Sequence, residues 1–190
     1  MLTQKEILEK TEEFVKECSI DNEPGHDFNH IVRVRKMAVY LAKELGLNTF
    51  FVEMLALLHD VEDPKLNPKT TVKEFLDTLD MKDMDREAIM HILPFISYSK
   101  YPTFPDHIPL VGKIVSDADR LDAIGAMGIA RAFSYGGSHH RSFEETLKHF
   151  DDKLLKLDQT LYLDKSKEIA KKRIEILREF YEEFILENNF

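Results

Sequence analysis

Apolar residues recur at intervals of three and four positions along nearly the whole chain, which is the spacing of one buried face of an α-helix. The clearest case runs from Lys165 to Glu187, where Ile169, Ile174 and Leu177 fall on one stripe. No segment shows the sustained alternation of apolar and polar residues that is typical of a half-buried strand. The pattern therefore predicts an all-α fold.

Glycine, proline and capping residues divide this pattern into separate helices. Thr3 and Glu6 have the spacing of a capping box, and Gly46 is a stop signal. The predicted helices are Thr3–Glu17, Asp27–Leu45, Asn48–His59, Thr70 or Thr71 to Leu79, Asp85–Ile96, Leu110–Ile124, Gly125–Phe133, Phe143–Leu157 and Lys165–Glu187. Residues Ser97–Pro109, with three prolines, and Ser134–Arg141 are predicted to be irregular. Because no repeat or linker interrupts the chain, we expect a single domain over residues 1–190.

Length and charge narrow the class of protein. The chain has 190 residues, enough for one domain to bury its own core. A net charge of −9 argues against polymeric nucleic acid as a partner, whereas a small phosphorylated ligand needs only a few local cations. No apolar run is long enough for a membrane span, and the first residues lack the layout of a signal peptide. The single cysteine, Cys18, fits a reducing compartment, so we expect a cytoplasmic protein. Aromatic residues in the last predicted helix are compatible with a homodimer.

Polar residues interrupt the apolar faces of three predicted helices. His30, His59 and Asp119 each lie in line with buried positions of their own helix. A buried histidine with one hydrogen-bond partner is common, so each histidine alone has a structural explanation. An ionised carboxylate is costly to bury without a partner, and Asp60, next to His59, meets the same difficulty as Asp119. Two imidazoles and two carboxylates suit a divalent transition metal that activates water.

Three segments around these residues resemble the HD superfamily of metal-dependent phosphohydrolases. They read GHDFNHIVRV at 25–34, ALLHDVEDPK at 56–65 and SDADRLDAIGAMGIAR at 116–131, the last followed by YGG at 135–137. The resemblance is to a small bacterial branch of single-domain, all-helical proteins, and it extends from about Gly25 through the final helix. It implies His30, His59, Asp60 and Asp119 as the four protein ligands of one divalent ion.

The resemblance also bears on the metal. At least one member of the branch is similar to a nucleoside triphosphate pyrophosphohydrolase that prefers manganese, so Mn²⁺ is the expected ion. Fe²⁺, Co²⁺, Ni²⁺, Zn²⁺ or Mg²⁺ would also be compatible with the set. Two-metal members of the superfamily carry further histidines before the final aspartate. His91 and His107 fall in that interval, but no second partner at suitable spacing is evident, so we expect one ion.

Acidic residues beyond the His59–Asp60 pair are candidates for handling the attacking water. Asp63, about one turn past His59, is the first candidate for orienting or deprotonating it, and Glu62 is the alternative. A purely structural role for Asp63, in the turn before Pro64, explains its position equally well.

Four cationic residues are candidates for binding substrate phosphate. His26 and Arg33 flank the first expected ligand, Lys65 follows the His–Asp pair, and Arg120 adjoins the expected ligand Asp119. Each of them alone could be an ordinary surface charge. Their closeness in sequence to the expected ligands favours a contact with phosphate for at least some of them.

These features predict a metal-dependent phosphohydrolase of a soluble phosphorylated metabolite, with a nucleotide as the expected substrate. Cleavage would release either pyrophosphate or orthophosphate. One alternative is an alarmone hydrolase acting on guanosine tetraphosphate, although His59-Asp60-Val-Glu-Asp63 is one residue shorter than the acidic signature of those enzymes. Another is a non-catalytic, metal-binding nucleotide sensor.

Overall fold

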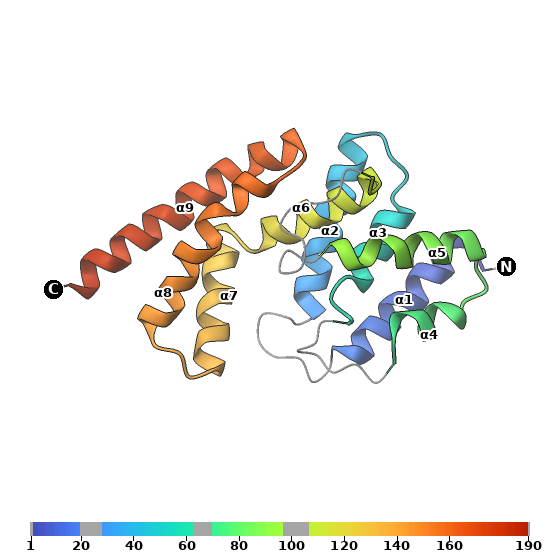
Figure 1. Cartoon of the computed structure of the whole chain (residues 1–190), viewed down its shortest axis with the longest axis horizontal. Coiled ribbons are helices and arrows are strands. Elements are labelled where there is room, and N and C mark those ends of the chain that lie inside the picture. Colours follow the sequence, from blue (N-terminus) through green and yellow to red (C-terminus); the bar gives the residue numbers. More distant parts are fainter. Residues whose placement is uncertain (1, 20–27, 63–69, 97–106, 190) are drawn as a thin grey trace. The chain divides into compact units, whose positions relative to one another are not determined.

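The computed structural model describes residues 2–19, 28–62, 70–96 and 107–189. Within these ranges every regular element is a helix, which confirms the all-α prediction. The described residues divide into two compact units (Figure 1), the first ending at Ser116 and the second beginning at Asp117. That the whole chain forms a single domain stays a prediction. None of the described helices combines the length and the apolar character that crossing a bilayer would require.

The first unit contains the helices α1 to α5 and the beginning of α6, and the second contains the end of α6 and the helices α7 to α9. Two short 3₁₀ helices, η1 and η2, follow α5 and α8. The bounds are α1 Gln4–Cys18, α2 Phe28–Glu44, α3 Phe50–Leu58, α4 Val72–Asp77, α5 Asp83–Ile92, η1 Leu93–Phe95, α6 Leu110–Asp122, α7 Gly125–Ser138, α8 Phe143–Asp152, η2 Leu154–Thr160 and α9 Asp164–Asn188.

Local signals in the sequence fix several helix ends. The Thr3 side chain accepts the backbone N–H of Glu6, and the Glu6 carboxylate accepts that of Thr3 at 2.8 Å, so the predicted capping box is confirmed. The same reciprocal pair forms between Thr71 and Glu74 at the start of α4. Gly46 has a φ of 66°, a left-handed conformation that suits the residue after a helix end.

The core of the first unit forms around α3, which packs against α1 and α2 (Figure 1). Seven of the nine residues of α3 are buried, because the helix is apolar on nearly every face. Arg35 of α2 donates hydrogen bonds to Glu12 of α1 at 2.8 Å and to Glu53 of α3 at 2.6 Å. This shared arginine holds the three helices together, and α2 and α3 are the helices that carry His30 and His59.

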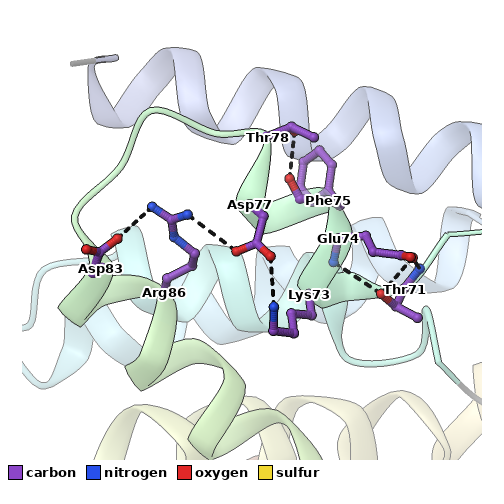
Figure 2. Close-up of polar contacts among 8 residues, drawn as sticks. All are labelled: Thr71, Lys73, Glu74, Phe75, Asp77, Thr78, Asp83 and Arg86. Carbon is purple, nitrogen blue, oxygen red and sulfur yellow. Dashed lines mark hydrogen bonds and ion pairs between the residues drawn. The ribbon is translucent and has the colours of Figure 1, made fainter.

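α4 and α5 pack beside this core. The rings of Phe14 in α1 and Phe75 in α4 are stacked, with centroids 4.0 Å apart. Figure 2 shows Arg86 of α5 between Asp77 of α4, at 3.4 Å, and Asp83, at 3.0 Å. The Phe14–Phe75 stack and the Arg86–Asp77 pair fix the short helix α4, which has too few residues to be stable by itself.

α5 begins two residues earlier than predicted, at Asp83, and it changes at Leu93 into the 3₁₀ helix η1. Pro94 lies in that 3₁₀ turn. Because proline has no backbone N–H, it cannot continue the α-helical hydrogen bonds, which explains the change.

In the second unit, α7, α8 and α9 share an aromatic core. The ring of Phe133 in α7 lies 5.7 to 5.9 Å, between centroids, from those of Phe143, Phe150, Phe180 and Phe184. The predicted helix from Phe143 ends at Asp152, where η2 takes over after Lys153.

The prediction of an irregular segment at Ser134–Arg141 was wrong for its first half, because α7 continues to Ser138. Gly136 and Gly137 have a low intrinsic helix propensity, but packing against α8 keeps this segment helical. A Cβ added to the buried Gly136 would lie 2.4 Å from the Thr146 hydroxyl oxygen of α8. The absence of a side chain at Gly136 therefore allows α7 and α8 to approach closely.

Candidate metal centre

His59 caps the C-terminus of α3, and its side chain is 2% exposed. Its Nδ1 lies 2.9 Å from the carbonyl oxygen of Ala56, one turn earlier. A carbonyl can only accept a hydrogen bond, so Nδ1 carries the proton and Nε2 of the neutral ring keeps its lone pair. That is the tautomer of a metal-binding histidine whose ring is oriented by a backbone carbonyl.

His30 and Asp60 meet this ring. His30 lies in the first turn of α2 and is 1% exposed. The Nε2 atoms of His30 and of His59 lie 3.4 Å from different carboxylate oxygens of Asp60. One ligand atom from each of the three residues lies within 4.8 Å of the other two. In the part of the chain that the structure describes, these side chains form a group that could hold a metal ion.

The donor atoms of this cluster suit a divalent ion. Metal–nitrogen and metal–carboxylate bonds of about 2.0 to 2.2 Å place neighbouring ligand atoms about 3 to 3.5 Å apart, and the two 3.4 Å separations agree with that spacing. Two imidazoles and one carboxylate favour a transition metal over calcium, which prefers oxygen ligands. Asp60 is 20% exposed, so the cluster is reached from solvent at its carboxylate.

Asp119, the fourth expected ligand, lies on α6 in the second unit and is partly buried. The other three expected ligands belong to the first unit. The structure thus brings together three of the four residues within one unit, and the participation of Asp119 stays a prediction.

A second buried carboxylate, Asp117, lies two residues before Asp119. Asp117 is fully buried and accepts hydrogen bonds from the backbone N–H groups of Tyr162 and Leu163, both at 2.9 Å. Burial raises the pKa of the Asp117 carboxyl, and these two backbone donors oppose the rise. Our sequence analysis did not single out Asp117. Its position three residues after the buried Ile114, on the apolar stripe of α6, was the available signal.

The two candidates for handling water have different outcomes. The Glu62 carboxylate accepts the backbone N–H of Val72, the first residue of α4, at 2.8 Å. This contact gives Glu62 a structural role at a helix start. Asp63 lies outside the described residues, so its role stays a prediction.

Of the four candidate phosphate-binding residues, His26 and Lys65 lie outside the described residues. Arg33, on α2 one turn after His30, is partly exposed. Arg120 is 2% exposed, and it donates a hydrogen bond to the carbonyl of Thr160. The contact of Arg120 favours a structural role, and a contact between any of these residues and phosphate stays a prediction.

His91 of α5 and His107 do not join the cluster. Both are exposed, and their ring centroids lie 6.2 Å apart, with Phe95 about equally close to each. Among the residues that the structure describes, the grouping with metal-binding geometry contains neither of them.

Comparison with known proteins places these observations in a family. The model of the HD domain matches residues 27–124, a range that includes His30, His59, Asp60 and Asp119. The protein YpgQ of Bacillus subtilis is 33% identical in an alignment of 182 positions, and the match covers 90% of this chain and 89% of YpgQ.

Solved structures agree with this match. The crystal structure of Bacillus subtilis YpgQ in complex with ADP is similar with a TM-score of 0.78 at 34% identity, over 93% of this chain and 95% of that one. An HD-superfamily hydrolase from Bacillus thuringiensis is similar with a TM-score of 0.78 at 37% identity, over 98% and 99% of the two chains. The matched range, the identities and the His–His–Asp cluster lead to one conclusion: the chain belongs to the HD domain family.

Proposed function

We propose that this protein is a metal-dependent phosphohydrolase whose substrate is a nucleotide. The observation that carries the proposal is the convergence of His30, His59 and Asp60, with the His59 proton held away on Nδ1. Asp119 completes the proposed ligand set. An ion held there would supply Lewis acidity, which lowers the pKa of water and polarises a phosphoryl oxygen.

The chain's own residues supply the remaining functions. Asp63 is proposed to orient the attacking water or to accept its proton, in preference to Glu62, whose carboxylate already accepts the Val72 N–H. Arg33 is proposed to contact substrate phosphate together with His26 and Lys65. Because the protein as a whole carries a net charge of −9, such local cations are needed to attract a phosphorylated ligand.

The ADP complex of Bacillus subtilis YpgQ supports a nucleotide as the substrate class, since that protein is similar to this chain over nearly its whole length. A nucleoside triphosphate can be cleaved in two ways. Attack on the α-phosphorus releases pyrophosphate, and attack on a terminal phosphorus releases orthophosphate.

The test is a substrate panel with purified protein and Mn²⁺. Nucleoside mono-, di- and triphosphates and guanosine tetraphosphate are offered separately, and orthophosphate and pyrophosphate are both measured. Release of either product from an ordinary nucleotide supports the proposal. Turnover of guanosine tetraphosphate alone would replace it with the alarmone hydrolase, and tight metal binding without any turnover would replace it with the sensor.

A pair of aspartate variants tests the ligand set in the same assay. Asp119→Ala is expected to lose both metal and activity. Asp77→Ala removes an exposed carboxylate of α4, outside the cluster, and is expected to keep both. Full activity in Asp119→Ala would refute the assignment of that ligand.

A further inference from the structure

The residues on either side of Asp119 are attached to one short segment of the second unit. On the N-terminal side, the Asp117 carboxylate accepts the N–H groups of Tyr162 and Leu163. These two residues directly precede α9, which begins at Asp164. Because a buried carboxylate is very costly without such donors, the attachment fixes the register of α6 against the segment.

On the C-terminal side, Arg120 makes the matching contact. Its guanidinium donates to the carbonyl of Thr160, and its central carbon lies 5.2 Å from the ring centroid of Tyr162. The side chain is almost completely buried, so both contacts are made away from bulk solvent. Residues 160–163 are therefore held by Asp117, two residues before Asp119, and by Arg120, the residue after it.

The next residues of α6 are also held within the second unit. The guanidinium of Arg173 in α9 donates to the carbonyl of Leu121. Arg131 of α7 pairs with Asp122 at 2.8 Å. The end of α6 thus has attachments on several sides, and Asp119 lies among them.

We propose that Asp117, Arg120 and the segment 160–163 form a positioning element that fixes the Asp119 carboxylate for metal binding. This inference rests on the proposed function, because it takes Asp119 as a ligand. Groups that hydrogen-bond directly to a metal ligand are typically worth about 10- to 100-fold in metal affinity, and this element acts one step further away, through the backbone of α6, so the lower end of about tenfold is expected. Arg120 is then a positioning residue, and its contacts explain why its guanidinium is buried.

Substitution of Arg120 distinguishes positioning from a purely electrostatic effect and from phosphate binding, because the three predict different changes in metal affinity. Arg120→Met removes a positive charge next to a cation site, so electrostatics alone predicts tighter metal binding. A role of Arg120 in phosphate binding predicts unchanged metal affinity and a higher KM. Loss of positioning predicts metal affinity weaker by about tenfold or more.

The experiment measures Mn²⁺ affinity without substrate, by competition with a fluorescent chelator, at a temperature where circular dichroism shows each variant folded. Arg120→Lys keeps the charge and a donor for the Thr160 carbonyl, so it should restore part of the affinity. Tyr162→Leu changes no charge and removes the ring under the guanidinium, and it should also weaken binding. It is the second test if Arg120→Met fails to fold.

Leu147→Ala is the control for lost stability. Leu147 is a buried residue of α8, and its truncation should lower the melting temperature while leaving Mn²⁺ affinity at the wild-type value. Wild-type or tighter Mn²⁺ binding in both Arg120→Met and Tyr162→Leu would overturn the inference. If Asp119→Ala itself binds Mn²⁺ normally, the ligand assignment fails, and that outcome is distinct from a failure of the positioning element alone.

Discussion

Substitution by alanine should destabilise the protein at Gly136 of α7 and stabilise it at the neighbouring Gly137. A Cβ at Gly136 would lie 2.4 Å from the Thr146 hydroxyl oxygen, whereas one at Gly137 has nothing within 4 Å. Thr146 is 3% exposed, and its hydroxyl donates to the Ser142 carbonyl at 3.0 Å, so the clashing atom cannot move freely.

The magnitudes follow from two opposing terms. Glycine to alanine inside a helix gains about 1 kcal/mol in free energy of unfolding. Overpacking a filled core costs about 1 to 3 kcal/mol, with the upper part of the range fitting a 2.4 Å contact. Gly136→Ala should therefore lose about 1 to 2 kcal/mol net, and Gly137→Ala should gain up to about 1 kcal/mol.

Thermal unfolding followed by circular dichroism measures both variants. For a chain of this size the melting temperature should fall by about 3 to 6 °C in Gly136→Ala and rise by up to about 4 °C in Gly137→Ala. The double variant Gly136→Ala/Thr146→Ala should lose less free energy of unfolding than the two single variants lose together, because the clashing oxygen is gone. Equal stability of the two single glycine variants would refute the close packing of α7 and α8.

Two further predictions concern the first unit. Arg35→Met should lower the free energy of unfolding by about 1 to 2 kcal/mol in a denaturant titration, because it leaves Glu12 and Glu53 without their shared partner. The control Lys73→Met breaks an exposed pair and should change the free energy of unfolding by less than about 0.5 kcal/mol. Equal effects of the two substitutions would contradict a stabilising role of Arg35 between α1, α2 and α3. Burial raises the pKa of the Cys18 thiol, so its alkylation by iodoacetamide should rise with pH at a higher midpoint than that of free cysteine, and a midpoint at or below the free value would contradict this.

Periodicity and capping chemistry were sufficient to predict the helical fold. The Thr3 capping box and the stop at Gly46 are local features, and both are present as expected. The extension of α7 past Phe133 could not be predicted in this way. Gly136 has a low helix propensity, and its helical conformation depends on α8, which the local sequence does not reveal.

The candidate site was predictable where a polar residue lies on an apolar helix face. His30 and His59 met that condition, and the structure brings them together with Asp60. Asp117 met it as well, yet its partners are backbone amides more than forty positions away in the chain. Backbone donors have no residue-type signature, so the contact of Asp117 with residues 162 and 163 is a property of the fold alone.

Binding of a divalent ion by the cluster of His30, His59 and Asp60 is the step on which the proposed function depends. Its most direct test is the Mn²⁺ stoichiometry and affinity of the purified wild-type protein beside His59→Phe, which keeps a ring of similar bulk and removes the ligand nitrogen. We expect one ion per wild-type chain and binding weakened by at least about 100-fold in the variant, whose melting temperature without metal should stay close to that of the wild type. Equal affinity of the two proteins for Mn²⁺ would contradict metal binding by this cluster.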